Sequence, residues 1–410
     1  MTRSNPSPRA PRAPRPAGGS RLPIDLGTLL SIAGLVLIGA VTLSLLGGNL
    51  PSLPGGPDGP DGPIRTPTPS NIVITPTDPP IDIPGSLLYE KDGNIWIQQG
   101  DVARQLTSSG SDSMPAWSPD GTQIYFVRTR REEGRWPSGG FTRTYHLEVP
   151  TLFRIAADGT GEPEALLTGR VRQGNLRWSY FIREPAVSPD GSTVALITDG
   201  PDPTRSDIVV KFLDLASGEL RNPNLPQSRS LGHQDPTWSS DGRFLLYVQN
   251  DREGARGVPS IRRYNPANGR SVAITSGGYA DPSWSRDGRW IAATRTSNVG
   301  TDVVILDARN GIEVLVVTRD GQSFNPIWSP RGDQLAFYKV THGVVDLFVV
   351  QLEGTAPDWT MQGPIALTIS AGLDAASRPA WFVPADQLPP LPTPTPVPTA
   401  APTGAATTAP

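Results

Sequence analysis

One short phrase recurs along the sequence, and its spacing limits the possible folds more than any other feature. "PAWSPDG" at 115–121 returns as "PAVSPDG", "PTWSSDG", "PSWSRDG" and "PIWSPRGD", and a truncated "PAWFVP" begins at Pro379. The third residue of each copy falls at 117, 187, 238, 284, 328 and 381, which gives intervals of 70, 51, 46, 44 and 53 residues. Periods of about 40 to 50 residues with several short strands per repeat are typical of β-propeller blades.

Each repeat contains the elements of a four-stranded antiparallel blade. The phrase supplies a short inner strand that ends in Trp, and a Pro/Asp/Gly turn follows it. A second strand is apolar, β-branched and aromatic, as in "QIYFV" and "FLLYV". A third strand and a second turn, such as "ADG" or "ANG", lead into a fourth strand that often ends in Thr. The repeats therefore predict an all-β chain.

The truncated last copy indicates how the ring closes. Before the first complete copy, "SLLYEKDGNIWIQQGDVARQLT" contains a second, third and fourth strand but no first, whereas "RPAWFV" contains a first strand alone. Together they complete one blade, so we predict a six-bladed β-propeller over residues 85–384. Joining ends about 290 residues apart costs about 5 kcal/mol of loop entropy. The ladder of the C-terminal strand and the burial of Trp381 must offset this cost, and closure also removes two aggregation-prone sheet edges.

The repeated P-x-W-S-P-D-G…I-x-F phrase resembles the WD40-like repeat of TolB-type six-bladed β-propellers. The resemblance covers residues 85–384. It departs from the pattern where Val187 replaces the Trp, where Arg331–Gly332–Asp333 changes one turn, and where the last copy lacks "SPDG". TolB is a soluble periplasmic protein that lacks the anchor expected here, and the resemblance implies a protein partner.

The apolar residues near the N-terminus predict a membrane anchor. The stretch Leu26–Leu46 holds no charged residue, and its helix would be about 31 Å long, which matches a bilayer core. The preceding tail carries five arginines, so the positive-inside rule keeps it in the cytoplasm. We therefore expect a basic cytoplasmic tail (1–21), a transmembrane helix (22–46) and an extracytoplasmic remainder. A cleaved signal peptide is the alternative.

Two segments of low complexity flank the predicted propeller. Residues 47–84 are rich in Pro, Gly and Thr and hold too few large apolar residues for a core, so they predict an extended linker. Residues 385–410, rich in Pro and Thr, predict a disordered tail by the same argument.

Composition excludes several classes of function. The chain has no cysteine, so disulfides, thiolate metal sites and cysteine nucleophiles are ruled out. A formal net charge of −3, with 18% charged residues, does not indicate a nucleic-acid-binding protein. We expect no cofactor and a monomer.

The two longest connections, 128–150 and 169–184, fall on the same face of the predicted propeller and are our candidate binding surface. Long loops in compact domains are often functional, and Arg and aromatic side chains carry many binding hot spots. In the alternative interpretation, the aromatics pin the two insertions together and the arginines are simply solvated. The arginines are Arg128, Arg130, Arg131, Arg135, Arg143, Arg170, Arg172, Arg177 and Arg183, and the interleaved rings are Trp136, Phe141, Tyr145, His146, Trp178, Tyr180 and Phe181.

The residues just before each inner-strand proline form a second candidate site, at the mouth of the central channel. Three carboxylates and an amide around one axis could hold a cation through oxygen ligands. The alternative is that these side chains cap backbone groups, and we assign no metal. The residues are Met114, Glu184, Asp235, Asp281, Asn325 and Arg378.

Catalytic motifs are absent from the sequence. It contains no G-x-S-x-G, H-E-x-x-H or P-loop pattern, and His146, His233 and His342 fall in different predicted blades. We therefore expect a membrane-anchored, extracytoplasmic, non-catalytic platform that binds a protein or an anionic envelope polymer. The alternative is a carbohydrate-active lyase or hydrolase that uses the channel-mouth carboxylates.

Overall fold

The computed structural model describes residues 82–202, 208–223, 225, 232–250 and 258–391, together with the short strand β1 (Ile72–Val73). The predicted cytoplasmic tail and anchor, most of the linker and the end of the tail lie outside the described residues. Within the part that is described, no helix combines the length and the apolar character needed to cross a membrane.

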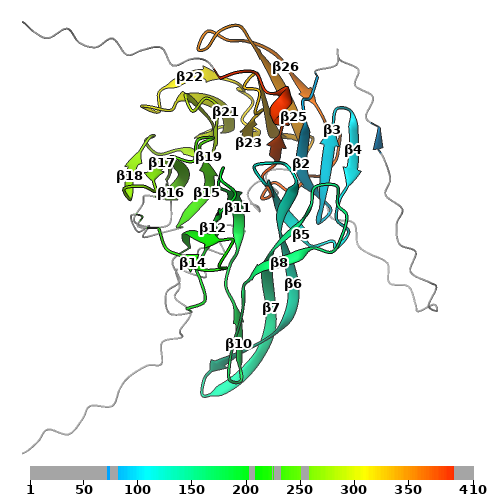
Figure 1. Ribbon diagram of the computed structural model, residues 1–410, viewed down its shortest axis with the longest axis vertical. Helices are drawn as coiled ribbons and strands as arrows, with labels where there is room; N and C mark the ends of the chain where they lie inside the picture. The colour runs from blue at the N-terminus through cyan, green and yellow to red at the C-terminus, as the bar shows by residue number, and fades with distance from the viewer. Residues whose placement is uncertain are drawn as a thin grey trace, which may run out of the picture. The chain divides into compact units, whose positions relative to one another are not determined.

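The described strands form a six-bladed propeller, as the repeat spacing predicts (Figure 1). Every blade is antiparallel, and its four main strands follow chain order from the inside outward, except that blade 1 takes its inner strand from the C-terminal part of the chain and adds β1 at its outer edge. Blade 1 contains β27 (Ala380–Phe382), β2 (Ser86–Lys91), β3 (Asn94–Gln99), β4 (Val102–Gln105) and β1. Blade 2 contains β5 (Asp112–Trp117), β6 (Gln123–Ser138), β7 (Phe141–Ala156) and β8 (Glu164–Thr168), with β9 (Arg170–Gln173) and β10 (Leu176–Ser179) added at the far end of β6.

The other four blades are regular four-stranded sheets. Blade 3 contains β11 (Arg183–Val187), β12 (Thr193–Thr198), β13 (Val209–Asp214) and β14 (Leu220–Arg221), and blade 4 contains β15 (His233–Trp238), β16 (Leu245–Asn250), β17 (Pro259–Asn265) and β18 (Arg270–Ala273). Blade 5 contains β19 (Tyr279–Trp284), β20 (Trp290–Ser297), β21 (Gly300–Asp307) and β22 (Glu313–Val316), and blade 6 contains β23 (Ser323–Trp328), β24 (Gln334–Thr341), β25 (Val344–Glu353) and β26 (Thr360–Ala366).

The hydrophobic core lies between the blades. Side chains alternate between the two faces of a strand, so each second strand sends one set of apolar residues to each neighbouring blade. In β2, Leu87 packs toward blade 6 against Tyr338, and Leu88 packs toward blade 2 against Phe126. The described buried residues fall into six such clusters, one for each pair of adjacent blades.

The C-terminal strand closes the ring as predicted. Strand β27 pairs antiparallel with β2, with Trp381 opposite Leu87. The Trp381 ring is 9% exposed, and its Nε1–H donates a 2.7 Å hydrogen bond to the carbonyl of Pro84. Packing continues past the expected limits of 85 and 384, because Ile83 is buried and Leu388 packs on the same cluster, just after the short 3-10 helix η1 (Ala385–Gln387).

The hydrogen bonds of the repeated phrase explain its composition. In the first copy, Ser118 Oγ donates to Asp120 Oδ1 (2.6 Å) and accepts from the Gln123 N–H, while Gly121 takes the positive φ that the turn needs. Asp190, Asp241 and Asp287 accept the same Ser–Asp bond in the next three copies. The phrase is therefore a structural repeat, as expected.

Candidate functional site

The two predicted binding insertions fold together into one arm, which we define as residues 128–150 and 169–183. Strands β6 and β7 pair in continuous register from Gln123 opposite Ala156 to Ser138 opposite Phe141. The β9–β10 hairpin joins them through Arg177, which lies opposite Arg135. Figure 1 shows β6, β7 and β10 projecting away from the ring of blades.

The regularity of the arm differs from the irregular loops that we expected. The "SGGF" turn explains it, because Gly139 and Gly140 both have positive φ (61° and 81°) and so form the two-residue turn that matches strand twist. That Gly-Gly pair was visible in the sequence and indicates a hairpin.

The aromatic residues of the arm hold the two hairpins together. Trp136 meets Trp178 edge to face at 5.4 Å between ring centroids, and Trp178 and Tyr180 are buried. The Tyr145 ring covers Gly134, where a Cβ would lie within 2.5 Å of ring atoms, and its hydroxyl donates to the Arg177 carbonyl (3.0 Å). Partial burial raises the pKa of Tyr145. The pinning interpretation therefore fits Trp136, Trp178 and Tyr180. Tyr145 contacts the second hairpin but stays 37% exposed, and Phe141 and Phe181 are exposed.

The arginines of the arm divide into engaged and available groups. Arg128 is engaged, because it forms two hydrogen bonds (2.6 and 2.9 Å) with the fully buried Asp112, which raises the pKa of the guanidinium. We therefore remove Arg128 from the predicted binding residues. The remaining ion pairs are Arg131–Glu148 (3.7 Å), Arg135–Glu133 (3.0 Å), Arg183–Glu184 (3.9 Å) and Arg170–Glu132.

Four arginines of the arm have no ion-pair partner among the described residues: Arg130, Arg143, Arg172 and Arg177. Three of them are exposed and Arg177 is half-buried. The Arg170 hydrogen bond, with Arg172 and Arg130 nearby, holds the pKa of Glu132 below its usual value. The arm therefore keeps an excess of positive charge that its own glutamates do not neutralise.

The channel-mouth residues form a ring of backbone caps. Five of the six have a left-handed backbone with φ between 50° and 55°, a strained conformation for a residue before proline. Side chains or carbonyls of other blades satisfy their polar groups around the ring. The bonds are Met114 N–H to Ser377 Oγ (2.7 Å), Glu184 N–H to Met114 Sδ (3.3 Å), Asp235 N–H to Glu184 Oε2 (2.7 Å), Asp281 N–H to Asp235 Oδ2 (3.2 Å), Asn325 N–H to Asp281 Oδ2 (3.4 Å) and Asn325 Nδ2 to the Ala375 carbonyl (2.9 Å).

Arg378 places its positive charge among these carboxylates. One of its guanidinium nitrogens donates to the carbonyls of Asp281, Pro282 and Pro326. Burial raises the pKa of Glu184, and burial together with the charges of Asp281 and Glu184 raises the pKa of Asp235. The described residues contain no group of three or more His, Asp or Glu side chains placed to hold a metal ion. The backbone-capping interpretation therefore fits the ring better than a cation site.

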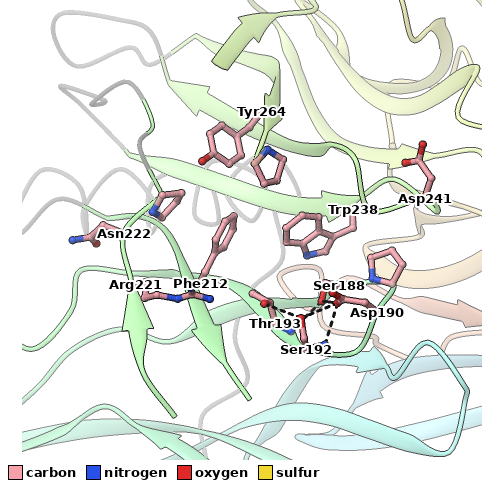
Figure 2. Close-up of a pocket in the computed structure, with 14 residues that line it drawn as sticks. Ser188, Asp190, Ser192, Thr193, Phe212, Arg221, Asn222, Trp238, Asp241 and Tyr264 are labelled. Carbon is pink, nitrogen blue, oxygen red and sulfur yellow. Dashed lines mark hydrogen bonds between the residues drawn. The ribbon is translucent and has the colours of Figure 1, made fainter. Parts of the chain in front are cut away.

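The sequence did not indicate a cavity of about 550 Å³ between blades 3 and 4. Figure 2 shows the rings of Phe212, Trp238 and Tyr264 around it, with Phe212 5.4 Å from Trp238 and 6.2 Å from Tyr264. Asp190 accepts hydrogen bonds from the turn that includes Ser192. Its carboxylate is therefore engaged within its own turn.

A smaller hollow of about 230 Å³ lies where the arm joins the channel mouth. Its wall includes Met114, Val127, Ile182 and Arg183, together with Phe181, which is 44% exposed. An apolar hollow beside a cation suits an inserted side chain better than a reaction.

Solved structures resemble this fold. TolB from Acinetobacter baumannii aligns with a TM-score of 0.50 at 20% identity, over 72% of this chain and 65% of that chain. The fold is a TolB-like β-propeller. A putative TolB from Agrobacterium tumefaciens (TM-score 0.46, 18% identity, 74% and 95% covered) and an oligogalacturonate lyase from Vibrio parahaemolyticus (0.41, 13%, 70% and 97%) align less well and support no conclusion about function.

The chain spans just under two thirds of the length of the Acinetobacter TolB. At these identities the likeness establishes the fold alone. No protein-family model and no curated protein matches the sequence.

Proposed function

We propose that this protein is a membrane-anchored, extracytoplasmic β-propeller that binds a protein or an anionic envelope polymer without catalysis. The observation that carries the proposal is the arm, which gathers eight arginines, Arg128 excluded, against three glutamates in a chain of formal net charge −3. Such a surface attracts an acidic partner and speeds its encounter. The apolar stretch Leu26–Leu46 and the basic tail before it support the proposed location.

The hollow at the base of the arm favours a protein among these partners. Hot spots in protein interfaces are often aromatic or Arg side chains that surround a desolvated pocket. Here Phe181 and Arg183 lie at such a hollow, beside the positively charged arm. A partner could anchor one apolar side chain in the hollow while its acidic residues contact the arm.

The carbohydrate-active alternative receives less support. A glycosidase needs one carboxyl group that is free to donate a proton and a second that is free to act as base or nucleophile. Glu184, Asp235 and Asp281 each accept a backbone N–H from the next blade, and Arg378 contacts the same ring. These carboxylates therefore have structural roles.

In-cell photo-crosslinking tests the proposed function. A photoreactive residue at Thr144, exposed on the arm, should capture a defined molecule in cells that make the full-length protein, whereas one at Ile312, which is 61% exposed on blade 5, should not. Capture should be lost in the double variant Arg172→Gln/Arg177→Gln. Equal capture from both positions, or capture that survives the double variant, would overturn the proposal.

A further inference from the structure

Three arginines lie side by side across the sheet of the arm. The pairing places Arg135 of β6 opposite Arg177 of β10, and Arg177 opposite Arg172 of β9. Directly opposite residues share a face, and neighbouring strands lie about 4.8 Å apart. On the other side of Arg135, β7 contributes the uncharged Thr144. The row therefore runs from Thr144 through Arg135 and Arg177 to Arg172, and its last residue is a cation at the sheet edge.

This row is unfavourable unless an anion joins it, because like charges directly opposite each other destabilise a sheet. Within the described part of the chain, Arg135 pairs with the exposed Glu133, and Glu132 lies near Arg172 but pairs with Arg170. Among the described residues, Arg172 and Arg177 have no ion-pair partner of their own. Charged residues do protect exposed edges, but that role needs a charge on β9 alone. It does not explain cations on β10 and β6 in the same row.

Strand β9 can accept another strand. It is the last strand of its sheet, in the order β8-β7-β6-β10-β9, so alternate backbone N–H and C=O groups face outward. Of these, the Arg170 N–H already donates to Thr168 Oγ1 (3.3 Å), which leaves the groups of Arg172 for pairing. Its side chains alternate in the same way, with the exposed Arg170 and Arg172 on one face and the half-buried Val171 on the other. An incoming strand would therefore meet the unpaired Arg172 on one face, with Arg170 beside it already paired to Glu132, and the half-buried Val171 on the other face.

From these features we propose that β9 accepts an extended segment of a partner protein, which adds as an antiparallel or parallel strand and places a Glu or Asp opposite Arg172. The matching segment alternates acidic and apolar residues. This inference rests on the proposed function and specifies its partner. A peptide fits better than a glycan, because the feature on which the proposal rests is a sheet edge, and a glycan lacks the regularly spaced backbone N–H and C=O groups that pair with such an edge.

Peptide binding to the full-length protein tests the proposal. The probe is a short peptide that alternates Glu and Val, compared with an isomer that groups the Glu residues together and with an alternating peptide N-methylated at every second residue. We expect the alternating peptide to bind, the isomer to bind at least tenfold more weakly, and the N-methylated peptide not to bind, because it cannot pair along a strand edge. Polygalacturonate serves as the glycan probe.

Variants locate the site. Arg172→Gln and Arg177→Gln should each weaken the alternating peptide about tenfold, as expected for loss of a charge-assisted contact. Arg270→Gln is the matched control, because Arg270 is an exposed arginine on β18, the outer strand of blade 4, and it should leave binding unchanged. Unchanged thermal unfolding shows that each variant is folded.

Each result supports or overturns the proposal. Equal binding of the N-methylated and unmodified peptides overturns strand addition, and so does tighter binding of polygalacturonate at Arg172. If the peptide fails while crosslinking from Thr144 still captures a molecule that depends on Arg172 and Arg177, strand addition is wrong and the proposed function stands. If both fail, the proposed function fails as well.

Discussion

The substitution Trp381→Ala tests whether the last strand closes the ring. The indole is 9% exposed, packs in a cluster with Leu87, Tyr89 and Tyr338, and donates to the Pro84 carbonyl. Losing about 200 Å² of buried surface at about 25 cal/mol per Å² removes about 5 kcal/mol. The lost hydrogen bond adds about 1 kcal/mol, and relaxation around the cavity recovers a part. We expect the free energy of unfolding to fall by about 4 to 5 kcal/mol, within the range for buried Trp.

Thermal unfolding of the full-length protein, followed by near-UV circular dichroism, measures this loss. A domain of about 300 residues has an unfolding entropy of about 0.6 kcal/mol/K, so Tm should fall by about 7 °C. Phe141→Ala is the control, because Phe141 is 74% exposed and its loss should shift Tm by less than about 1 °C. Truncation after Leu373 should lower Tm further, since it removes β27 and Ser377. If Trp381→Ala and the truncation both melt within about 1 °C of the parent, the closure argument is wrong.

Three further predictions concern stability. Burial and the nearby Asp374 raise the pKa of Glu90 to about 7 from 4.5. Between these pH values the folded state therefore holds a proton on Glu90 that the unfolded chain has released. The free energy of unfolding should fall by about 1 to 3 kcal/mol from pH 5 to pH 7. Urea titrations at both pH values should show this fall, and Glu90→Gln should make it smaller. Asp112→Asn leaves Arg128 without its buried partner and should cost about 3 kcal/mol in urea unfolding, whereas an unchanged midpoint would contradict the pairing. Ser377→Ala removes the acceptor of the Met114 N–H and should cost about 1 to 2 kcal/mol, and a Tm equal to the parent's would show that this link of the ring is dispensable.

Repetition made the fold predictable. Six copies of one phrase set the number of blades, and four of them repeat the same Ser–Asp hydrogen bond in the turn after the inner strand. The missing inner strand before Ser86 and the unfinished copy at Trp381 predicted the closure. A departure from the repeat pattern in one blade does not change the predicted fold, since each blade packs only against its two neighbours.

The candidate site was only partly predictable, because its residues depend on pairings between distant segments. The sequence placed the two insertions on one face, but the register that puts Arg135, Arg177 and Arg172 in a row is set by two separate turns. Arg128 resembled its neighbours in the sequence, yet its partner Asp112 is buried on an adjacent strand. Capping by Glu184 likewise depends on the closeness of successive inner strands around the channel, which no local pattern encodes.

The shared sheet of blade 1 imposes an order on biosynthesis. Strands β2 to β4 leave the ribosome before the other blades, but their inner neighbour β27 is made about 290 residues later. At about 5 to 20 residues per second, the edge of β2 waits about 15 to 60 s for its partner. Throughout that interval it is open to pairing with another nascent chain, so the yield of native protein should depend on whatever shields that edge until β27 emerges.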